Sequence, residues 1–177
     1  MAHPDQQKFC KEIKQEFSLF FQNKKVLDVG SLDVNGNNRH LFEECDYIGL
    51  DVAKGKNVDV VCVAHEYDVE DESFDTIIST NALEHDMYYV LTLKKMVLLL
   101  KPGGFLLFSV ANSFGEHGTK RKNPMDSNTS KMDESWANYY KNLTPEDIRR
   151  VLNLDEIFSK YKLEVVKKDL RFWGIKK

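Results

Sequence analysis

The chain has 177 residues, 25 of them basic and 28 acidic, so its formal net charge is −3. This balance excludes a globally basic nucleic-acid-binding protein, and a hydrophobic content of 42% excludes a chain that is disordered throughout. The length predicts one domain over residues 1–177. No window approaches the roughly 20 apolar residues that span a bilayer. Three separated cysteines, without a CxxC pair, and a start without a secretory signal favour a cytoplasmic protein.

The hydrophobic pattern predicts short buried strands that alternate with helices. Phe9, Ile13 and Phe17 recur at helical spacing, which predicts an amphipathic helix over about 5–22. A second long helix is expected over about 86–100, ending before Pro102 and the glycines that follow it. Between and after them we expect strands at 25–30, 46–51, 58–63, 73–79 and 105–110, with a brief helix at 39–44.

The order of these elements predicts an α/β fold. Continuous apolar strands that alternate with helices are typical of a parallel sheet covered on both faces, a doubly wound arrangement. Only residues 64–72 separate the third and fourth strands, too few for a crossover helix, so these strands should not be neighbours. A helix should begin at Thr144 and Pro145. The segments 162–168 and 170–175 are expected to form an antiparallel pair that closes the sheet.

The polar segment 111–143 breaks the alternation. An insertion of this length inside a compact domain is typically functional, so we expect a lid that contains a short helix. Its aromatic side chains either wall an acceptor site or pack the lid onto the domain. Its basic run either meets phosphate, carboxylate or nucleic acid, or is a solvated loop. The aromatic residues are Trp136, Tyr139 and Tyr140, and the basic run includes Lys120, Arg121 and Lys122.

The ends of the first two strands carry residues suited to a nucleoside ligand. Gly30 allows a sharp turn after the first strand, and Gly36 allows close approach of a ligand or helix. Asp51 ends the second strand, 23 positions after Asp28, and can accept two hydrogen bonds from ribose hydroxyls. The G-x5-G spacing differs from the G-x-G-x-x-G of nicotinamide enzymes, which disfavours an oxidoreductase.

A third polar group, at Asn81, Glu84 and His85, follows the fourth strand and should reach the same crevice. His85 is suited to be a general base, because a neutral imidazole is present near physiological pH. His117, in the insertion, and Glu84 are the next candidates. The histidines lack the spacing of metal ligands, so the sequence predicts no metal site.

Five motifs occur in the order found in one enzyme class. They cover about residues 24–111 and resemble class I S-adenosylmethionine-dependent methyltransferases, in particular the small methyltransferase-domain group with an L-E-H motif. The resemblance implies a Rossmann-like, mostly parallel seven-stranded sheet with an antiparallel last strand and a helical lid insertion at 111–143. The motifs are Lys25–Gly30, Tyr47–Asp51, Ser73–Asp75, Asn81–His85 and Leu100–Gly104.

The same resemblance assigns residues to S-adenosylmethionine. The turn after the first strand would hold the methionine portion, and Asp51 would bind the ribose. Val52, Ala64 and His65 would lie along the adenine. The loop after the fourth strand would line the sulfonium. By the resemblance the methionine residues are Asp28, Gly30, Ser31, Asn35 and Gly36, and the sulfonium residues are Asn81, Ala82 and Leu83.

Two departures from the family pattern affect cofactor binding. Val63 and Ala64 stand where Asp-Ala is frequent, so a backbone group or Asp68 replaces the acceptor for the adenine amino group, or adenine binds more weakly. Residues 33–35 stand where a glycine-richer loop is usual.

The resemblance implies transfer of a methyl group from S-adenosylmethionine to an unidentified acceptor, a small molecule by preference, with S-adenosylhomocysteine as product. Alignment of nucleophile, methyl and sulfur supplies most of the catalysis in such a displacement. The alternative is a catalytically inactive, S-adenosylmethionine-binding regulatory subunit. No membrane partner is expected.

Overall fold

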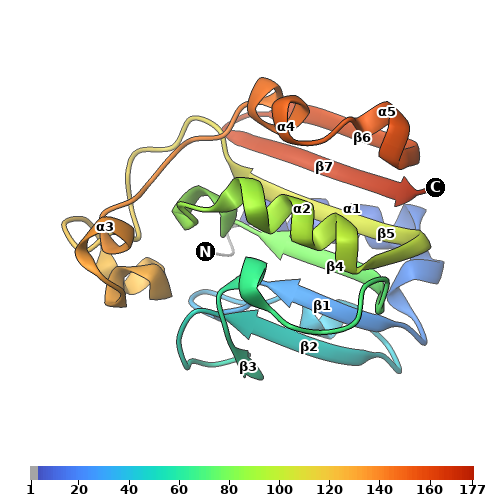
Figure 1. The fold of residues 1–177 in the computed structure, drawn as a ribbon, viewed down its shortest axis with the longest axis horizontal. Helices are drawn as coiled ribbons and strands as arrows, with labels where there is room; N and C mark the ends of the chain where they lie inside the picture. The colour runs from blue at the N-terminus through green and yellow to red at the C-terminus, as the bar shows by residue number, and fades with distance from the viewer. Residues whose placement is uncertain (1–3) are drawn as a thin grey trace.

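A computed structural model describes residues 4–177, which are organised around one seven-stranded sheet of order β3-β2-β1-β4-β5-β7-β6 (Figure 1). Neighbours among β1 to β5 pair in parallel, whereas β7 is antiparallel to both β5 and β6. This arrangement confirms the predicted fold class. The strands are β1 (Lys25–Val29), β2 (Asp46–Asp51), β3 (Val60–Val61), β4 (Phe74–Thr80), β5 (Leu100–Ala111), β6 (Phe158–Val166) and β7 (Asp169–Lys176).

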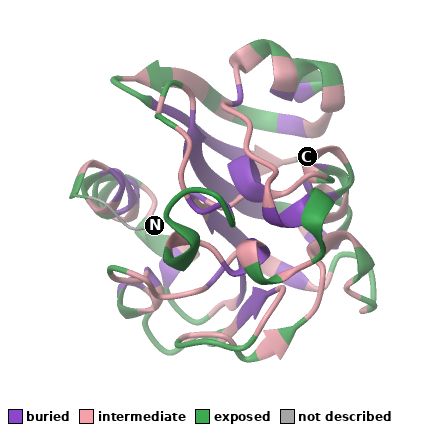
Figure 2. Ribbon diagram, turned by 90° about the vertical axis from the view of Figure 1, so that its left-hand side faces the viewer, coloured by how far each residue is buried: buried purple, intermediate pink, exposed green. Residues whose placement is uncertain are grey.

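Helices cover both faces of the sheet (Figure 1). On one face α1 (Pro4–Glu16) and the 3₁₀ turn η1 (Ser18–Phe21) bury Phe9, Ile13 and Phe21. On the other face α2 (Tyr89–Leu99), α4 (Pro145–Val151) and α5 (Leu154–Ile157) bury a second apolar cluster. The buried residues in Figure 2 accordingly follow the central strands, and the exposed ones lie at the periphery.

The order in which successive strands are added to the sheet reverses at β1. β2 and β3 extend the sheet on one side of β1, and β4 pairs with its other side. The connection from β3 to β4, which holds only the 3₁₀ turn η3 (Ala64–Glu66), crosses between these two sides, as predicted from its shortness. In open α/β sheets such a switch point leaves a crevice at the carboxyl ends of the strands, where ligands bind.

Several elements differ in extent from their predictions. The first helix ends at Glu16, because Phe17 leaves the helical region (φ −125°, ψ 41°) and the chain continues as η1. β3 has only two residues, fewer than the predicted 58–63. Just before it, the Asp59 side chain, rather than a backbone carbonyl of β3, accepts the hydrogen bond from the Gly49 amide of β2. The helix after β4 begins at Tyr89, and β5 begins at Leu100.

Segment 111–143 extends from the sheet beyond the carboxyl ends of β1 and β2 (Figure 1). It contains the 3₁₀ turns η5 (Pro124–Asp126) and η6 (Asn128–Lys131) and, as predicted, one short helix, α3 (Glu134–Ala137), which includes Trp136. The remaining 3₁₀ turns are η2 (Arg39–Leu41) and η4 (Leu83–His85). Within residues 4–177 no helix combines the length and apolar character needed to cross a membrane.

Candidate active site

A pocket lies at the switch point, enclosing about 620 Å³ of space including its open mouth. Its floor comes from the ends of β1, β2 and β4, and its roof from segment 111–143. The lining mixes polar side chains such as Asp51 and Asn128 with apolar ones such as Val52 and Trp136, which suits a small ligand that has both kinds of surface. The lining residues are Val29, Gly30, Leu32, Val34, Leu50, Asp51, Val52, Cys62, Ala64, Asn81, Ala82, Leu83, His85, Asp86, Asp126, Ser127, Asn128, Thr129 and Trp136.

Gly30 forms the turn where β1 enters the pocket. Its φ of +77° lies in the left-handed region that favours glycine. A Cβ atom at this position would lie 2.1 Å from the Cβ of Ala82, so the loop after β1 touches the loop after β4. The amide of Gly30 donates to the Leu50 carbonyl (2.8 Å), which fixes the turn against β2.

Asp51 presents its carboxylate at the end of β2 and is only 8% exposed. Oδ2 accepts the Leu32 amide (3.1 Å), and Oδ1 accepts the Val52 amide (2.8 Å) and the Asn128 side chain (3.0 Å). Burial raises the pKa of this carboxyl above its usual value, against the effect of these donors. The acid is therefore held rigidly, with segment 111–143 bonded directly to it.

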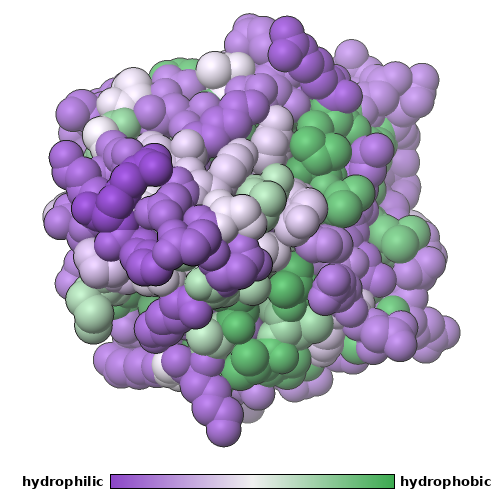
Figure 3. Space-filling view, turned by 60° about the vertical axis from the view of Figure 1, so that its left-hand side comes forward, coloured by the Kyte–Doolittle hydropathy of each residue, from purple (hydrophilic) through white to green (hydrophobic). Residues whose placement is uncertain are grey.

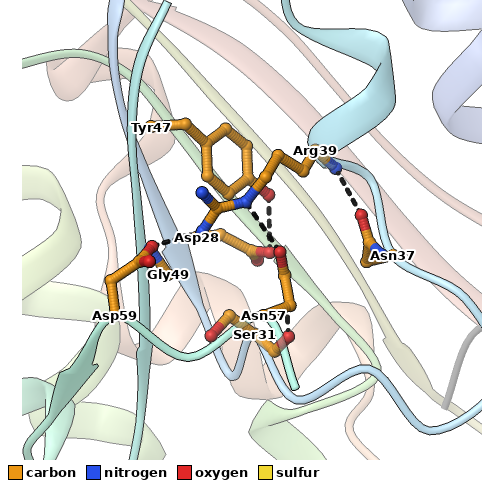
Figure 4. A network of polar contacts seen from close by, with 8 residues as sticks. All are labelled: Asp28, Ser31, Asn37, Arg39, Tyr47, Gly49, Asn57 and Asp59. Carbon is orange, nitrogen blue, oxygen red and sulfur yellow. Dashed lines mark hydrogen bonds and ion pairs between the residues drawn. The ribbon is translucent and has the colours of Figure 1, made fainter. Parts of the chain in front are cut away.

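Asp28 lies in a different environment. Its carboxyl group is buried and accepts the Tyr47 hydroxyl (2.6 Å; Figure 4). It faces the α1 side of the sheet, near Cys10. Asp28 is not among the residues that line the pocket. Burial raises its pKa to about 7. Its carboxyl group is thus poorly placed to contact a ligand directly.

The surrounding polar network supports the turn after β1 (Figure 4). Arg39 stacks over Tyr47 (4.6 Å from the ring centroid), donates to Asn57 (2.7 Å) and pairs with Asp59. Asn57 in turn donates to the Ser31 carbonyl (2.9 Å). The network holds the loop after β1 through residues that lie outside the pocket lining.

Because the folded Asp28 holds its proton up to about pH 7, this residue should make stability depend on pH. An unfolded aspartate ionises near its usual pKa of 3.8, so unfolding between these two values releases a proton, and rising pH favours unfolding. The Asp28→Asn variant keeps an acceptor for Tyr47 but cannot ionise. We expect it to match the wild type at about pH 4 and to exceed it by roughly 4 kcal/mol or less at about pH 8, in urea unfolding. Parallel pH profiles of the two proteins would contradict this account.

The loop 33–36 folds around its own aspartate. Asp33 accepts the Gly36 amide (2.7 Å) and the Asn37 side chain (2.8 Å) and pairs with Lys56 (2.8 Å). The hydrogen-bonded ion pair with Lys56 is the largest cause of the lowered pKa of Asp33. Asn35 and Gly36 thus belong to a compact turn and are absent from the pocket lining.

Of the residues that the resemblance assigns to the adenine, Val52 and Ala64 line the pocket wall, together with Cys62. His65 instead packs its ring on Tyr88, with centroids 5.0 Å apart, and is not a lining residue. Asp68 is exposed and also lies outside the lining.

The loop after β4 supplies Asn81, Ala82 and Leu83 to the pocket. Asn81 adopts a left-handed conformation (φ 50°) and accepts the Ser109 hydroxyl from β5 (3.1 Å). This turn exposes the loop backbone to the pocket and places η4 directly beside it.

Three titratable residues gather next to this loop. Ligand atoms of Glu84, His85 and His117 all lie within 4.8 Å of one another, although His117 comes from segment 111–143. Burial raises the pKa of Glu84 to about 7 and lowers that of His85 to about 3, so His85 is neutral but weakly basic. Tyr140 packs against both imidazoles, with ring centroids 5.5 and 5.1 Å away.

Comparison with known proteins identifies the family. A family model described as a methyltransferase domain matches residues 1–168. The chain belongs to this family. The match confirms the predicted methyltransferase family. Solved structures with the same fold hold S-adenosylhomocysteine or S-adenosylmethionine, which supports S-adenosylmethionine as the predicted cofactor. Among curated proteins, none matches the sequence of this methyltransferase.

Solved structures share the fold of the methyltransferase at low sequence identity. One is the Burkholderia thailandensis 1,6-didemethyltoxoflavin-N1-methyltransferase, with 1,6-didemethyltoxoflavin and S-adenosylhomocysteine bound (16% identity, TM-score 0.66, covering 98% of this chain and 78% of that chain). Another is the Haemonchus contortus phosphoethanolamine N-methyltransferase 2, with phosphomonomethylethanolamine and S-adenosylhomocysteine (22%, 0.60, 89% and 38%). A third is an S-adenosylmethionine-dependent methyltransferase from Aquifex aeolicus (14%, 0.63, 99% and 94%).

The aromatic residues of segment 111–143 divide between two places in the methyltransferase. Trp136 is buried at the pocket wall and donates its Nε1 proton to the His85 carbonyl (3.2 Å). Tyr139 and Tyr140 lie outside the lining, and Tyr140 donates to Asn142 (3.3 Å). The side of the molecule that carries this segment is mainly hydrophilic, with separate hydrophobic patches (Figure 3).

The basic run of the methyltransferase is partly neutralised within the same segment. Lys120 pairs with Glu134, and Arg121 pairs with Glu116 (2.6 Å). Lys122 contributes its backbone to a turn with Thr119. These pairs favour the solvated-loop interpretation over a nucleic-acid contact.

Sequence reasoning missed the residues through which segment 111–143 reaches the methyltransferase pocket. Asn128 donates to Asp51 and also to the Ala53 carbonyl (2.8 Å), across 77 and 75 positions of the chain. An asparagine in a polar insertion gives no local signal of such a contact. Asp126, Ser127 and Thr129 were missed for the same reason.

Proposed function

We propose that this methyltransferase transfers a methyl group from S-adenosylmethionine to a small-molecule acceptor by in-line displacement, leaving S-adenosylhomocysteine. The observation that carries the proposal is the Asp51 carboxylate, held at the end of β2 beside the Gly30 turn and facing one pocket. An acid and a glycine turn on adjacent strands suit a ribose and the chain attached to it.

In this proposal the pocket residues divide the cofactor between them. The turn from Gly30 to Leu32 borders the methionine portion, Asp51 binds the ribose hydroxyls, and the adenine lies near Val52. Asn81, Ala82 and Leu83 border the sulfonium. Asp28, Ser31, Asn35, Gly36 and His65 act by supporting the loops, since none of them lines the pocket.

We also propose that residues 1–177 work as a single domain in which segment 111–143 is a lid over the acceptor. Two solved neighbours have small acceptors bound, 1,6-didemethyltoxoflavin and phosphomonomethylethanolamine. A narrow pocket walled by Trp136 suits an acceptor of that size. The ion pairs of Lys120 and Arg121 reduce the charge that a nucleic acid would need.

Catalysis rests mainly on alignment, because the sulfonium already activates the methyl group. Correct positioning alone can supply ~7–11 kcal/mol of the barrier. The cluster of Glu84, His85 and His117 borders the acceptor side, since His85 lines the pocket. Where the acceptor must lose a proton, we assign that task to this cluster. The alternative of an inactive regulatory subunit has no support from the comparisons.

Two measurements test the proposed function. Calorimetry should show one site for S-adenosylhomocysteine per chain. A screen with methyl-labelled S-adenosylmethionine should then give labelled product with at least one pool of amines, phospho-amines or nitrogen heterocycles. Cofactor binding with no transfer to metabolite, protein or nucleic-acid pools would instead support the regulatory alternative. Failure to bind the cofactor would contradict the proposal as a whole.

The contact between Asn128 and Asp51 gives a prediction for the lid. Asn128→Ala removes two hydrogen bonds that hold segment 111–143 against β2. We expect residues 113–130 to be cleaved several-fold faster by protease in the variant, with bound S-adenosylhomocysteine slowing cleavage in both proteins. Ser130→Ala is a matched control, because its hydroxyl bonds only within the segment. Equal cleavage of Asn128→Ala and wild type would show that these two hydrogen bonds do not hold segment 111–143 against β2.

A further inference from the structure

Glu84 and His85 are buried without the partners that such groups normally have. Glu84 is 0% and His85 2% exposed. Within residues 4–177, neither carboxylate oxygen of Glu84 and neither ring nitrogen of His85 has a hydrogen-bond partner. The backbone amides of Glu84 and Ala111 lie close enough to the Glu84 carboxylate to offset part of the rise in its pKa. Burying polar groups in this way costs free energy, and native proteins usually satisfy them. Four such atoms side by side indicate a missing ligand.

His117 brings a third group to the cluster. Its Nδ1 lies 3.0 Å from the Gly115 carbonyl, which can only accept, so Nδ1 carries the proton and Nε2 keeps its lone pair. Metal-binding histidines are commonly oriented by a hydrogen bond of this kind. The rings of His85 and His117 meet edge to face, with centroids 5.1 Å apart.

The backbone on both sides of the cluster is fixed. Gly118 has φ +61°, and a Cβ there would lie 2.5 Å from Cε1 of His85, so only glycine lets the loop pass this closely. From the other direction, Trp136 donates to the His85 carbonyl, and the Lys141 amide donates to the Glu84 carbonyl (2.9 Å). Segment 111–143 thus holds the three groups in one place.

We propose that Glu84, His85 and His117 form a binding site for a divalent transition-metal cation, zinc foremost. Two imidazole nitrogens and one carboxylate oxygen are a ligand set that zinc takes in catalytic sites, where a further position stays open. Tetrahedral ligands with bonds of about 2.1 Å stand roughly 3.4 Å apart. Ligand atoms already within 4.8 Å reach that spacing by small side-chain rotations. The histidine spacing along the sequence gave no sign of this site, because the third ligand lies 32 positions downstream.

The location gives the metal a use, and this part rests on the proposed function. His85 belongs to the pocket lining, so an ion bound to it would border the space assigned to the acceptor. The open coordination position would hold an acceptor oxygen, nitrogen or sulfur in place for the displacement. Metal binding itself does not depend on methyl transfer.

The test uses full-length, tag-free protein stripped with a chelator. Titration with Co(II), followed by visible absorption, and with Zn(II), by calorimetry, should show one site per chain. His117→Ala should weaken metal binding by at least about 100-fold, because mutating residues that only orient a metal ligand already costs up to about 100-fold in affinity. His40→Ala is the matched control, because that histidine is exposed and outside the cluster, and it should bind as the wild type does. Mg²⁺, which prefers oxygen ligands, should not compete.

Glu84→Gln keeps the shape of the buried side chain and should weaken binding similarly. Thermal unfolding of each stripped variant shows that it is folded. Equal Co(II) affinity in wild type and His117→Ala, or no saturable site in the wild type, would overturn the inference. Calorimetry with S-adenosylhomocysteine on the same samples separates the two proposals. Cofactor binding without a metal site removes only this inference, whereas metal binding without cofactor binding removes the proposed function.

Discussion

Replacing Asp51 with alanine is expected to weaken binding of S-adenosylhomocysteine by about 100-fold or more. Hydrogen bonds to a charged group contribute roughly 1.5–3 kcal/mol each, so the loss of two bonds to ribose hydroxyls reaches about 3 kcal/mol. The buried carboxylate also orders the amides of Leu32 and Val52, and that order is lost too. Isothermal calorimetry measures the change.

Two further variants distinguish loss of the ribose contact of Asp51 from a general loss of structure. Asp51→Asn keeps one acceptor oxygen and should fall between wild type and Asp51→Ala. Asp46→Ala removes an exposed acid at the other end of β2 and should leave affinity unchanged. If Asp51→Ala bound the ligand as tightly as wild type, the ribose assignment would be wrong.

Gly30→Ala is expected to lower the free energy of unfolding by roughly 3 kcal/mol and to abolish measurable cofactor binding. Two penalties combine at this position. Alanine resists a φ of +77°, and its Cβ would lie 2.1 Å from that of Ala82. Relief of the clash requires the loops after β1 and β4 to separate, and these loops form the pocket floor. Urea unfolding and calorimetry measure the two effects.

The double variant Gly30→Ala/Ala82→Gly tests this explanation. Removal of the Ala82 Cβ eliminates the clash but not the backbone penalty, which is about 1–2 kcal/mol. We therefore expect the double variant to recover roughly half of the lost stability. A double variant as unstable as Gly30→Ala would show that close packing against Ala82 is not the cause.

The fold could be predicted because its determinants are local. Strands 25–29 and 46–51 each contain a short apolar stretch, and the short connection 64–72 sets the position of β4 relative to β1. The capping box of Thr144 and Asp147 starts α4 where the sequence indicated. The ends of helices and strands were harder to predict, because contacts between residues apart in the sequence, such as that of Asp59 with Gly49, determine them.

The candidate site could be predicted only in part, for a related reason. Gly30, Asp51 and Asn81 follow strands of the sheet, so strand order alone brings them to one edge. Asp28 lies one position before the end of β1, but side chains alternate along the strand, and its carboxyl points to the α1 face, where it accepts the Tyr47 hydroxyl. His117 reaches its partners through tertiary packing that no local pattern records.

The bond from Asn128 to Asp51 implies a constraint on turnover. The Asp51 carboxylate that would bind the ribose also accepts the hydrogen bond from Asn128 in segment 111–143. If segment 111–143 acts as the proposed lid, exchange of S-adenosylhomocysteine for S-adenosylmethionine would require it to move away from Asp51, so each catalytic cycle would include a conformational step in addition to the chemical one. A faster chemical step in an engineered variant would not by itself raise the steady-state rate once roof movement sets the pace.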